Sequence, residues 1–291
     1  MKKVMFAAAL AAGMVAFGDG VESGIVGYTT FEPGGSVKCM KGFAFQNTSG
    51  GAIDLQSIVA YDGDSIESGD GAFKIWWWNT VSGDRGNKYA VWSNYWWDED
   101  LDDYVDAADE SEYCWVVPEV DDDLPIKWTK SFSNGEGFFV QAGVPSPSLT
   151  ISGAIVPVDP ADEYYEMALV GSQKKLITNP FPVAWNLSDI VAYDGGDVES
   201  GDGAFKIWWW NTVSGDRGNK YAVWSNYWWD EDLDDYVDAA DESEYCWVVP
   251  EVDDDLPIKW TKSFGVGEGF FVQAGVPSPS IMFPNPFYKA P

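Results

Sequence analysis

Aromatic rings alternate with lysine, serine and asparagine along two neighbouring segments, Phe73–Trp78 and Tyr89–Trp97, in a pattern that could bind sugars. On an extended strand, successive residues lie on opposite faces. Flat rings stack on the C–H faces of a pyranose, while neighbouring polar groups bond its hydroxyls. Both segments recur 132 residues later. The sequence therefore predicts a ligand-binding face in each copy, formed by Trp76, Trp78, Trp92, Asn94, Trp96, Trp208, Trp210, Trp224, Asn226 and Trp228.

Two structural explanations compete with sugar binding. One face of each strand must enter the core, and the other could be covered by loops or by the neighbouring copy. Exposed aromatic patches also mark contacts between molecules, so the second face could be an assembly interface.

Carboxylates alternate in the segment that begins at Asp98. They occupy loop positions 1, 3, 5 and 9, a spacing that suits calcium, which takes about six to eight oxygen ligands. Asp103 stands at the sixth position, where an EF-hand has glycine, and Asp109 at the last, where it has glutamate, so the site would be of another type. A solvated acidic loop is the alternative. The predicted calcium ligands are Asp98, Asp100, Asp102, Asp106, Asp230, Asp232, Asp234 and Asp238.

Two carboxylic acids are enough for glycoside hydrolysis. Glu136 and Glu268 each lie between glycines before a Phe-Phe pair, and Glu112 and Glu244 are further candidates. A tight turn that needs glycine explains Glu136 more simply. The chain has no histidine, which excludes Ser-His-Asp and Cys-His nucleophiles and histidine-bound zinc. We therefore expect a protein without catalytic residues.

All of these residues occur twice because the chain contains a long internal repeat. Ile58–Ser148 and Ile190–Ser280 are identical at 86 of 91 aligned positions. A period of this length indicates tandem domain-sized modules. Duplicating a binding surface raises avidity, whereas duplicating an active site only doubles its amount, so the repeat favours binding or assembly.

The elements that would position these residues are strands. Runs of aromatic and β-branched residues alternate with Gly-, Pro- and Asp-rich connections, which favours an all-β, sandwich or jelly-roll-like module. Ser82–Asn87 is a turn that would join the two aromatic segments into a hairpin. Further strands are predicted at Glu112–Val117, Pro125–Lys130 and Gly137–Gln141, and the second-copy strands at Phe205–Trp210, Tyr221–Trp229, Glu244–Val249, Pro257–Lys262 and Gly269–Gln273.

The N-terminal segment has the features of a bacterial export signal. Lys2 and Lys3 precede the apolar run Val4–Phe17, and Ala16-Phe17-Gly18 is a small-x-small cleavage site. We expect a signal peptide over residues 1–18, a first module over 19–152 and a second over 153–291, with no membrane span and a secreted or cell-surface location.

The charge of the chain limits its partners. Loss of the two signal lysines changes the formal net charge from −30 to about −32, which repels nucleic acid. A glycan, a cation, a surface protein or a further copy of the chain is the expected partner. Cys114 and Cys246 are equivalent and Cys39 has no counterpart, so we expect buried free thiols, with an intermolecular bridge through Cys39 as the alternative.

Short motifs open and close the second module: Asn179-Pro180-Phe181-Pro182 with Trp185-Asn186-Leu187, and Gly267-Glu268-Gly269-Phe270-Phe271-Val272. The first module keeps the closing motif at Gly135–Val140 but lacks the opening prolines. This pairing resembles a β-rich cassette of secreted and surface proteins of bacteria, mostly of unassigned function. The resemblance implies export and β-architecture and no catalytic residues.

Together these features predict an exported, non-catalytic carbohydrate-binding protein with paired tryptophan-rich faces. A self-assembling cell-surface structural protein and a carboxylate-only glycoside hydrolase are the alternatives.

Overall fold

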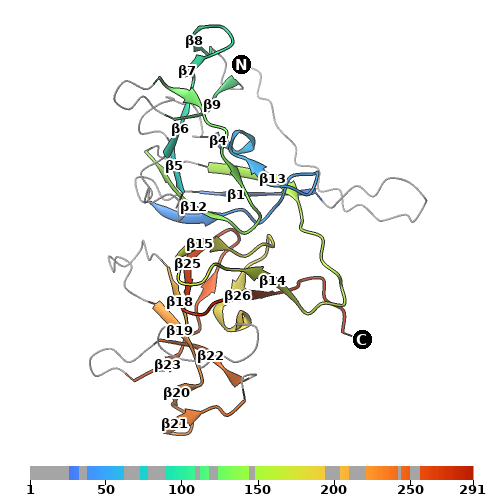
Figure 1. The fold of residues 1–291 in the computed structure, drawn as a ribbon, viewed down its shortest axis with the longest axis vertical. Coiled ribbons are helices and arrows are strands. Elements are labelled where there is room, and N and C mark those ends of the chain that lie inside the picture. The colour runs from blue at the N-terminus through green and yellow to red at the C-terminus, as the bar shows by residue number, and fades with distance from the viewer. Residues whose placement is uncertain are drawn as a thin grey trace, which may run out of the picture.

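The computed structural model describes residues 26–32, 38–61, 73–77, 89–108, 112–117, 124–143, 148–193, 204–209, 221–241, 244–249 and 256–290. They form two modules that follow one another along the long axis (Figure 1). No α-helix occurs in these ranges, and the predicted all-β architecture of two tandem sandwich modules is confirmed. The signal segment and the Ser82–Asn87 turn lie outside the described residues.

The first module packs a large sheet against smaller ones. Its eight-stranded sheet has the order β2-β12-β5-β6-β9-β10-β7-β8, and the small sheets are β1-β13-β4 and β11-β3. A 3₁₀ turn, Leu55–Ser57, follows β3. The strands are β1 (Val26–Phe31), β2 (Cys39–Gly42), β3 (Ile53–Asp54), β4 (Val59–Tyr61), β5 (Phe73–Trp77), β6 (Tyr89–Ser93), β7 (Tyr95–Asp98), β8 (Asp103–Asp106), β9 (Cys114–Val117), β10 (Ile126–Lys127), β11 (Ser131–Phe132), β12 (Gly137–Ala142) and β13 (Ser148–Ala154).

The second module repeats this topology. Its sheets have the orders β15-β25-β18-β19-β22-β23-β20-β21, β14-β26-β17 and β16-β24, and a 3₁₀ turn spans Leu187–Asp189. The strands are β14 (Tyr164–Ala168), β15 (Lys175–Thr178), β16 (Trp185–Asn186), β17 (Val191–Tyr193), β18 (Phe205–Trp208), β19 (Tyr221–Ser225), β20 (Tyr227–Asp230), β21 (Asp235–Asp238), β22 (Cys246–Val249), β23 (Ile258–Lys259), β24 (Ser263–Phe264), β25 (Gly269–Ala274) and β26 (Ser280–Pro284).

The last strand of the first module runs past residue 152, the expected end of that module. β13 continues to Ala154 and pairs with both β1 and β4, so the whole strand belongs to the first module. The second module begins its first strand at Tyr164. The short connection between these strands is consistent with modules that are held close together.

The inner face of each large sheet forms the main core with the small sheets. On β5, Phe73, Ile75 and Trp77 are buried and Lys74 and Trp76 are only partly so, as strand alternation predicts. The predicted hairpin is also confirmed, because β5 pairs antiparallel with β6.

Trp115 lies at the centre of the first core. Its side chain is completely buried, and its indole N–H donates to the carbonyl of Ile58 over 2.9 Å. Trp247 and Ile190 repeat this bond over 2.8 Å. The bond satisfies a polar group that would otherwise be buried without a partner.

The predicted strand Tyr89–Trp97 is in fact two strands with a bend at Asn94. The Ser93 hydroxyl accepts from the Tyr95 N–H over 3.0 Å, which holds the bend. β6 then pairs with β9, whereas β7 pairs with β8 and β10. Trp92 packs in the main core, but Trp96 joins a second cluster on the other side of the sheet. Simple alternation of side chains through Asn94 therefore assigns the residues after the bend to the wrong face of the sheet.

The two modules meet at the edge strands of their large sheets, β2 and β15. The Gly42 N–H donates to the carbonyl of Gly267 over 2.9 Å, and the Thr178 N–H donates to the carbonyl of Gly135 over the same distance. Gly42 and Thr178 are equivalent, since each pairs with the first residue of the adjoining long strand. The junction therefore has pseudo-twofold symmetry, and each module covers the open edge of the other.

Glycine permits the close approach at this junction. A Cβ on Gly137 would lie 2.6 Å from Cγ of Leu176, and a Cβ on Gly269 would lie 3.0 Å from the carbonyl oxygen of Lys41. The first glycine of each closing motif has another role, because Gly135 and Gly267 adopt positive φ angles of 74° and 66°. In the motif Gly-Glu-Gly, the turn thus explains the first glycine and the contact between modules explains the second.

Candidate functional site

Four of the six described rings of the predicted ligand-binding face are buried. Trp92 and Trp224 lie in the main cores, and Trp96 and Trp228 lie in the second clusters, with exposed fractions between 4% and 6%. These four side chains offer no face to a sugar, which corrects the sequence-based prediction. The cause is the bend after Ser93 together with burial of both faces of the central strand β6.

The other predicted positions differ from these four. Trp76 and Trp208 are partly exposed, whereas Trp78 and Trp210 lie outside the described residues. The side-chain amides of the two predicted asparagines form hydrogen bonds within the protein. Asn94 donates to Asp106 and Asn226 donates to Asp238, each over 3.1 Å. They position the hairpin that follows and do not point to a ligand by themselves.

An exposed aromatic surface lies instead on the hairpin formed by β7 and β8. Tyr95 is 44% and Tyr104 38% exposed, and their rings stack 4.9 Å apart with planes 9° from parallel. Trp97 meets Tyr104 edge to face, and Ile126, 40% exposed, is its neighbour on β10. We call these four residues the hairpin patch; its copy consists of Tyr227, Trp229, Tyr236 and Ile258.

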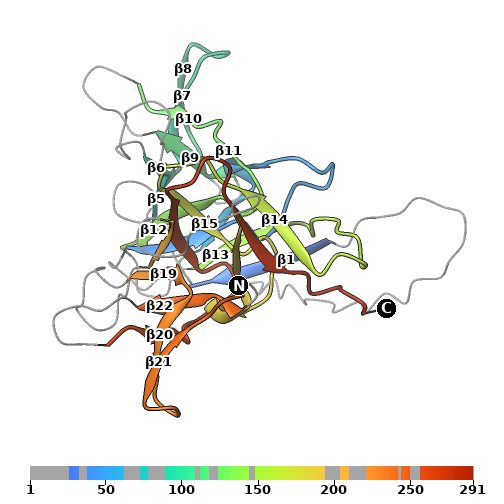
Figure 2. The same ribbon diagram turned by 60° about the horizontal axis from the view of Figure 1, so that its bottom comes forward.

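The two patches lie at opposite ends of the molecule. The hairpin of β7 and β8 projects at one end of the long axis, and that of β20 and β21 projects at the other (Figures 1 and 2). The sequence-based reasoning missed Tyr95 and Trp97 because it assigned them to the core face. Ser93-Asn94, a pair of turn-forming residues within the run, was the available signal.

The predicted calcium ligands shape the turn of the same hairpin. Asp98 accepts from the N–H groups of Asp100 and Leu101 over 3.0 and 3.3 Å, and Asp102 has a positive φ of 51°. In the second module, Asp230 accepts the equivalent hydrogen bonds from the N–H groups of Asp232 and Leu233. Within the described ranges, no three acidic or thiol side chains are grouped as a metal would require. Calcium binding stays a prediction.

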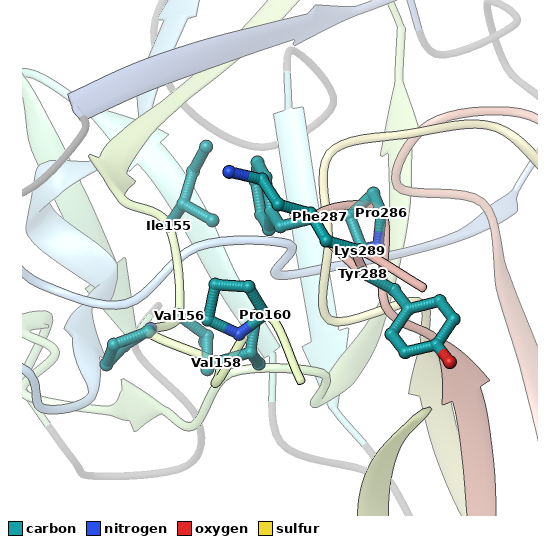
Figure 3. Close-up of a pocket in the computed structure, with 9 residues that line it drawn as sticks. Ile155, Val156, Val158, Pro160, Pro286, Phe287, Tyr288 and Lys289 are labelled. Carbon is teal, nitrogen blue, oxygen red and sulfur yellow. The ribbon is translucent and has the colours of Figure 1, made fainter. Parts of the chain in front are cut away.

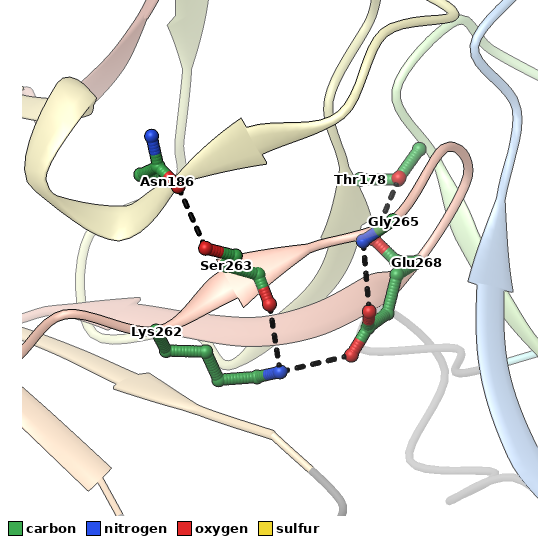
Figure 4. Close-up of polar contacts among 6 residues, drawn as sticks. All are labelled: Thr178, Asn186, Lys262, Ser263, Gly265 and Glu268. Carbon is green, nitrogen blue, oxygen red and sulfur yellow. Dashed lines mark hydrogen bonds and ion pairs between the residues drawn. The ribbon is translucent and has the colours of Figure 1, made fainter.

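Glu136 and Glu268 stabilise tight turns. Glu268 accepts from the N–H of Gly265 over 3.0 Å and pairs with the ammonium of Lys262 over 3.2 Å, while its carbonyl accepts from the Thr178 hydroxyl (Figure 4). Glu136 makes the equivalent carboxylate contacts with Ser133 and Lys130. The other two acids considered above, Glu112 and Glu244, are exposed. Glu136 and Glu268 thus stabilise the turns in which they lie through these hydrogen bonds and ion pairs.

A row of rings crosses the junction on the outer side of the large sheets. Phe139, Trp76 and Tyr89 are successive cross-strand partners, and they face away from the core residues Phe138 and Val140. The second module repeats the row, and the Phe139 and Phe271 rings lie 5.7 Å apart at the centre. We call this set the junction row: Tyr89, Trp76, Phe139, Phe271, Trp208 and Tyr221.

One apolar pocket lies between the module connection and the C-terminal segment (Figure 3). It has a volume of about 610 Å³, and only Tyr288 and Lys289 among its lining residues have polar side chains. It therefore lacks a pair of acids for catalysis. The lining residues are Ile155, Val156, Pro157, Val158, Pro160, Pro286, Phe287, Tyr288 and Lys289.

All three cysteines are free thiols, and burial affects two of them. Burial raises the pKa of Cys114 from 9.0 to about 11, partly offset by Lys127, and Cys246 behaves in the same way beside Lys259. Because the folded pKa is raised, the thiols favour the folded state below pH 9, and this contribution is lost as the pH rises toward about 11.

We expect the melting temperature to fall between pH 9 and pH 11, and to fall less steeply in a Cys114→Ala/Cys246→Ala variant. Thermal unfolding at a series of pH values measures this slope. Equal slopes in the double variant and the wild type would contradict the assignment.

In comparisons with known proteins, no family model, no curated protein and no solved structure matches this chain. In the part of the chain that the structure describes, no helix is long and apolar enough to cross a membrane.

Proposed function

We propose that this is an exported, non-catalytic protein that binds carbohydrate through its two hairpin patches. The observation that carries the proposal is the exposure of the same stacked tyrosines and adjoining tryptophan in both modules. Such rings lose water and gain contacts when a pyranose covers them. The bond from Asn94 leaves a further oxygen of the Asp106 carboxylate beside Tyr95, and a sugar hydroxyl can donate a hydrogen bond to that oxygen.

The position of the patches favours bridging over tight binding of one short chain. Because they project from opposite ends of the molecule, a small oligosaccharide occupies one patch only, whereas separate polymer chains can occupy both (Figure 2). The firm contact between β2 and β15 fixes this arrangement. The protein would therefore cross-link polysaccharides.

Self-assembly at a cell surface is the second candidate. The exposed Leu101 and Leu233 at the hairpin tips, each 66% exposed, favour it together with the patches. Two self-associating surfaces at opposite ends of a molecule lead to open-ended filaments when each surface contacts a further copy. This candidate requires oligomers that form without any glycan.

Removing one ring from each patch tests the function. In a Trp97→Ala/Trp229→Ala variant we expect the affinity for a neutral polysaccharide to fall roughly tenfold or more, because each site loses a stacking ring. Isothermal titration across a panel of soluble neutral glycans measures the affinity. Tyr28→Ala, which removes an exposed ring from β1, is the matched control.

The single variants separate bridging from simple binding. Trp97→Ala alone should still bind through the second module but no longer cross-link polymer, which light scattering detects. Absence of binding to every glycan in the panel, or unchanged affinity in the double variant, would refute carbohydrate recognition at the patches. Concentration-dependent oligomers that disappear in the double variant would instead support assembly.

A further inference from the structure

Four lysines lie over the junction row in a chain that has 47 acidic and only 17 basic residues: Lys74 and Lys206 over its outer tyrosines, and Lys38 and Lys174 over its central rings. The Lys38 ammonium lies 3.8 Å from the centroid of the Trp76 ring and 5.6 Å from that of Phe139. Lys174, its equivalent, lies 4.4 Å from the centroids of both Trp208 and Phe271. The chain thus places a matched pair of cations on either side of its pseudo-twofold axis.

Among the residues that the structure describes, no carboxylate lies close enough to Lys38 or Lys174 to form an ion pair. The described ion pairs of Lys130 with Glu136 and of Lys262 with Glu268 brace turns. Burial lowers the pKa of both lysines. Partly dehydrated cations without a counter-ion are sites where an anion gains more than it would in open water.

The rings beneath the lysines select among anions. Trp76 and Trp208 are partly exposed, so a flat, apolar surface adjoins each cation. A sugar acid presents both matching features, a charged group and a C–H face, whereas an acidic peptide offers the charge alone. The two halves of the row meet at the Phe139 and Phe271 rings, of which Phe271 is buried, so one partly exposed tryptophan lies on each side of the junction, an arrangement that fits a repeating polymer.

We propose that the junction row is a second binding surface, which takes an acidic saccharide across the two modules. Lys38 and Lys174 hold its carboxylate or sulfate groups, and its rings lie against Trp76 and Trp208. This surface differs from the hairpin patches in place and in ligand chemistry. It exists only where the modules are joined, so a single module would contain half of it.

Binding of defined acidic polymers to the full-length chain tests this inference. The probes are polygalacturonate for carboxylates, a sulfated galactan for sulfates, dextran as a neutral polymer and polyglutamate as an acidic peptide. The measurement is made at about 0.1 M salt, where charges more than about 10 Å apart are screened. We expect saturable binding of at least one acidic saccharide, and weaker or no binding of dextran and polyglutamate.

The matched variants assign this binding to the lysines. In Lys38→Met/Lys174→Met the affinity should fall roughly tenfold or more, as expected when charge-assisted hydrogen bonds are removed. Lys38→Arg/Lys174→Arg should retain binding, and Lys289→Met, which removes a cation elsewhere, should not alter it. Unchanged melting temperatures show that the junction is intact, and single Lys→Met variants replace the double variant if it unfolds.

Each outcome bears on the proposal. No saturable binding of either acidic saccharide, or undiminished binding by the methionine double variant, overturns it. Polyglutamate binding as tight as the saccharide also overturns it, because the surface would then recognise charge alone, as in docking of another copy's acidic hairpin. Trp97→Ala/Trp229→Ala should retain acidic-saccharide binding, so failure at the hairpin patches and failure at the junction row are distinguishable.

Discussion

A valine in place of Gly137 or Gly269 should force the two modules apart. Either side chain would occupy space that the edge strand of the other module fills: the Leu176 side chain in one case, and the Lys41 backbone in the other. Overpacking of this kind costs about 1–3 kcal/mol, and more where backbone must move. We expect a lower melting temperature and a longer, more variable particle, measured by calorimetry and small-angle X-ray scattering.

Gly265→Ala is the control for this result. It lies in the same kind of turn, but an added Cβ would meet only a Glu268 carboxylate oxygen at 3.8 Å. It should therefore leave both measurements unchanged. If Gly137→Val and Gly269→Val behave like this control, the modules are not held together at β2 and β15.

Truncation of the central core ring should have the largest effect within a module. Trp115→Ala removes a completely buried indole and leaves the Ile58 carbonyl without its donor. We expect the free energy of unfolding of the first module to fall by about 3–5 kcal/mol, the usual cost of such a cavity. Urea unfolding followed by tryptophan fluorescence measures the loss, and Trp247→Ala should act in the same way on the second module.

A tryptophan-to-alanine change at the partly exposed Trp97 provides the comparison for Trp115→Ala. Trp97 is partly exposed on β7, so Trp97→Ala should cost well under half as much as Trp115→Ala. Similar losses at the two positions would mean that Trp97 belongs to the core. The proposed role of the hairpin patch would then be untenable.

Local patterns in the sequence were sufficient to predict much of the fold. Alternation along Phe73–Trp77 placed Trp77 inside and Trp76 outside, and the pairing of β5 with β6 follows from two aromatic runs joined by a turn. These features depend on residues close together in the chain.

The binding face was predicted less well because one bend reverses the alternation. A run from Tyr89 to Trp97 reads as a single strand, but the Ser93 hydroxyl stabilises a bend, and the faces of Trp92 and Trp96 diverge. β6 is also buried on both faces, so tryptophan content alone could not distinguish surface from interior. The exposed rings are one residue away, at Tyr95 and Trp97.

The junction was beyond sequence-based prediction because it depends on contacts distant in the chain. Gly42 meets Gly267, and Thr178 meets Gly135, across separations that no local pattern records. The Gly-Glu-Gly motif was correctly interpreted as a turn. The need for its second glycine is seen only in the contact with the edge strand of the opposite module, at Leu176 or at Lys41.

The reciprocal covering of β2 and β15 gives the duplication a use that is independent of any ligand. A single module would leave an edge strand of its large sheet uncovered, and uncovered edge strands pair nonspecifically with other chains. When two modules are joined in one polypeptide, the edge strand of each is covered by the other module in a fixed one-to-one ratio. The smallest self-sufficient unit of this architecture is therefore the pair, although the two edge strands differ in sequence, Cys39–Gly42 in one module and Lys175–Thr178 in the other.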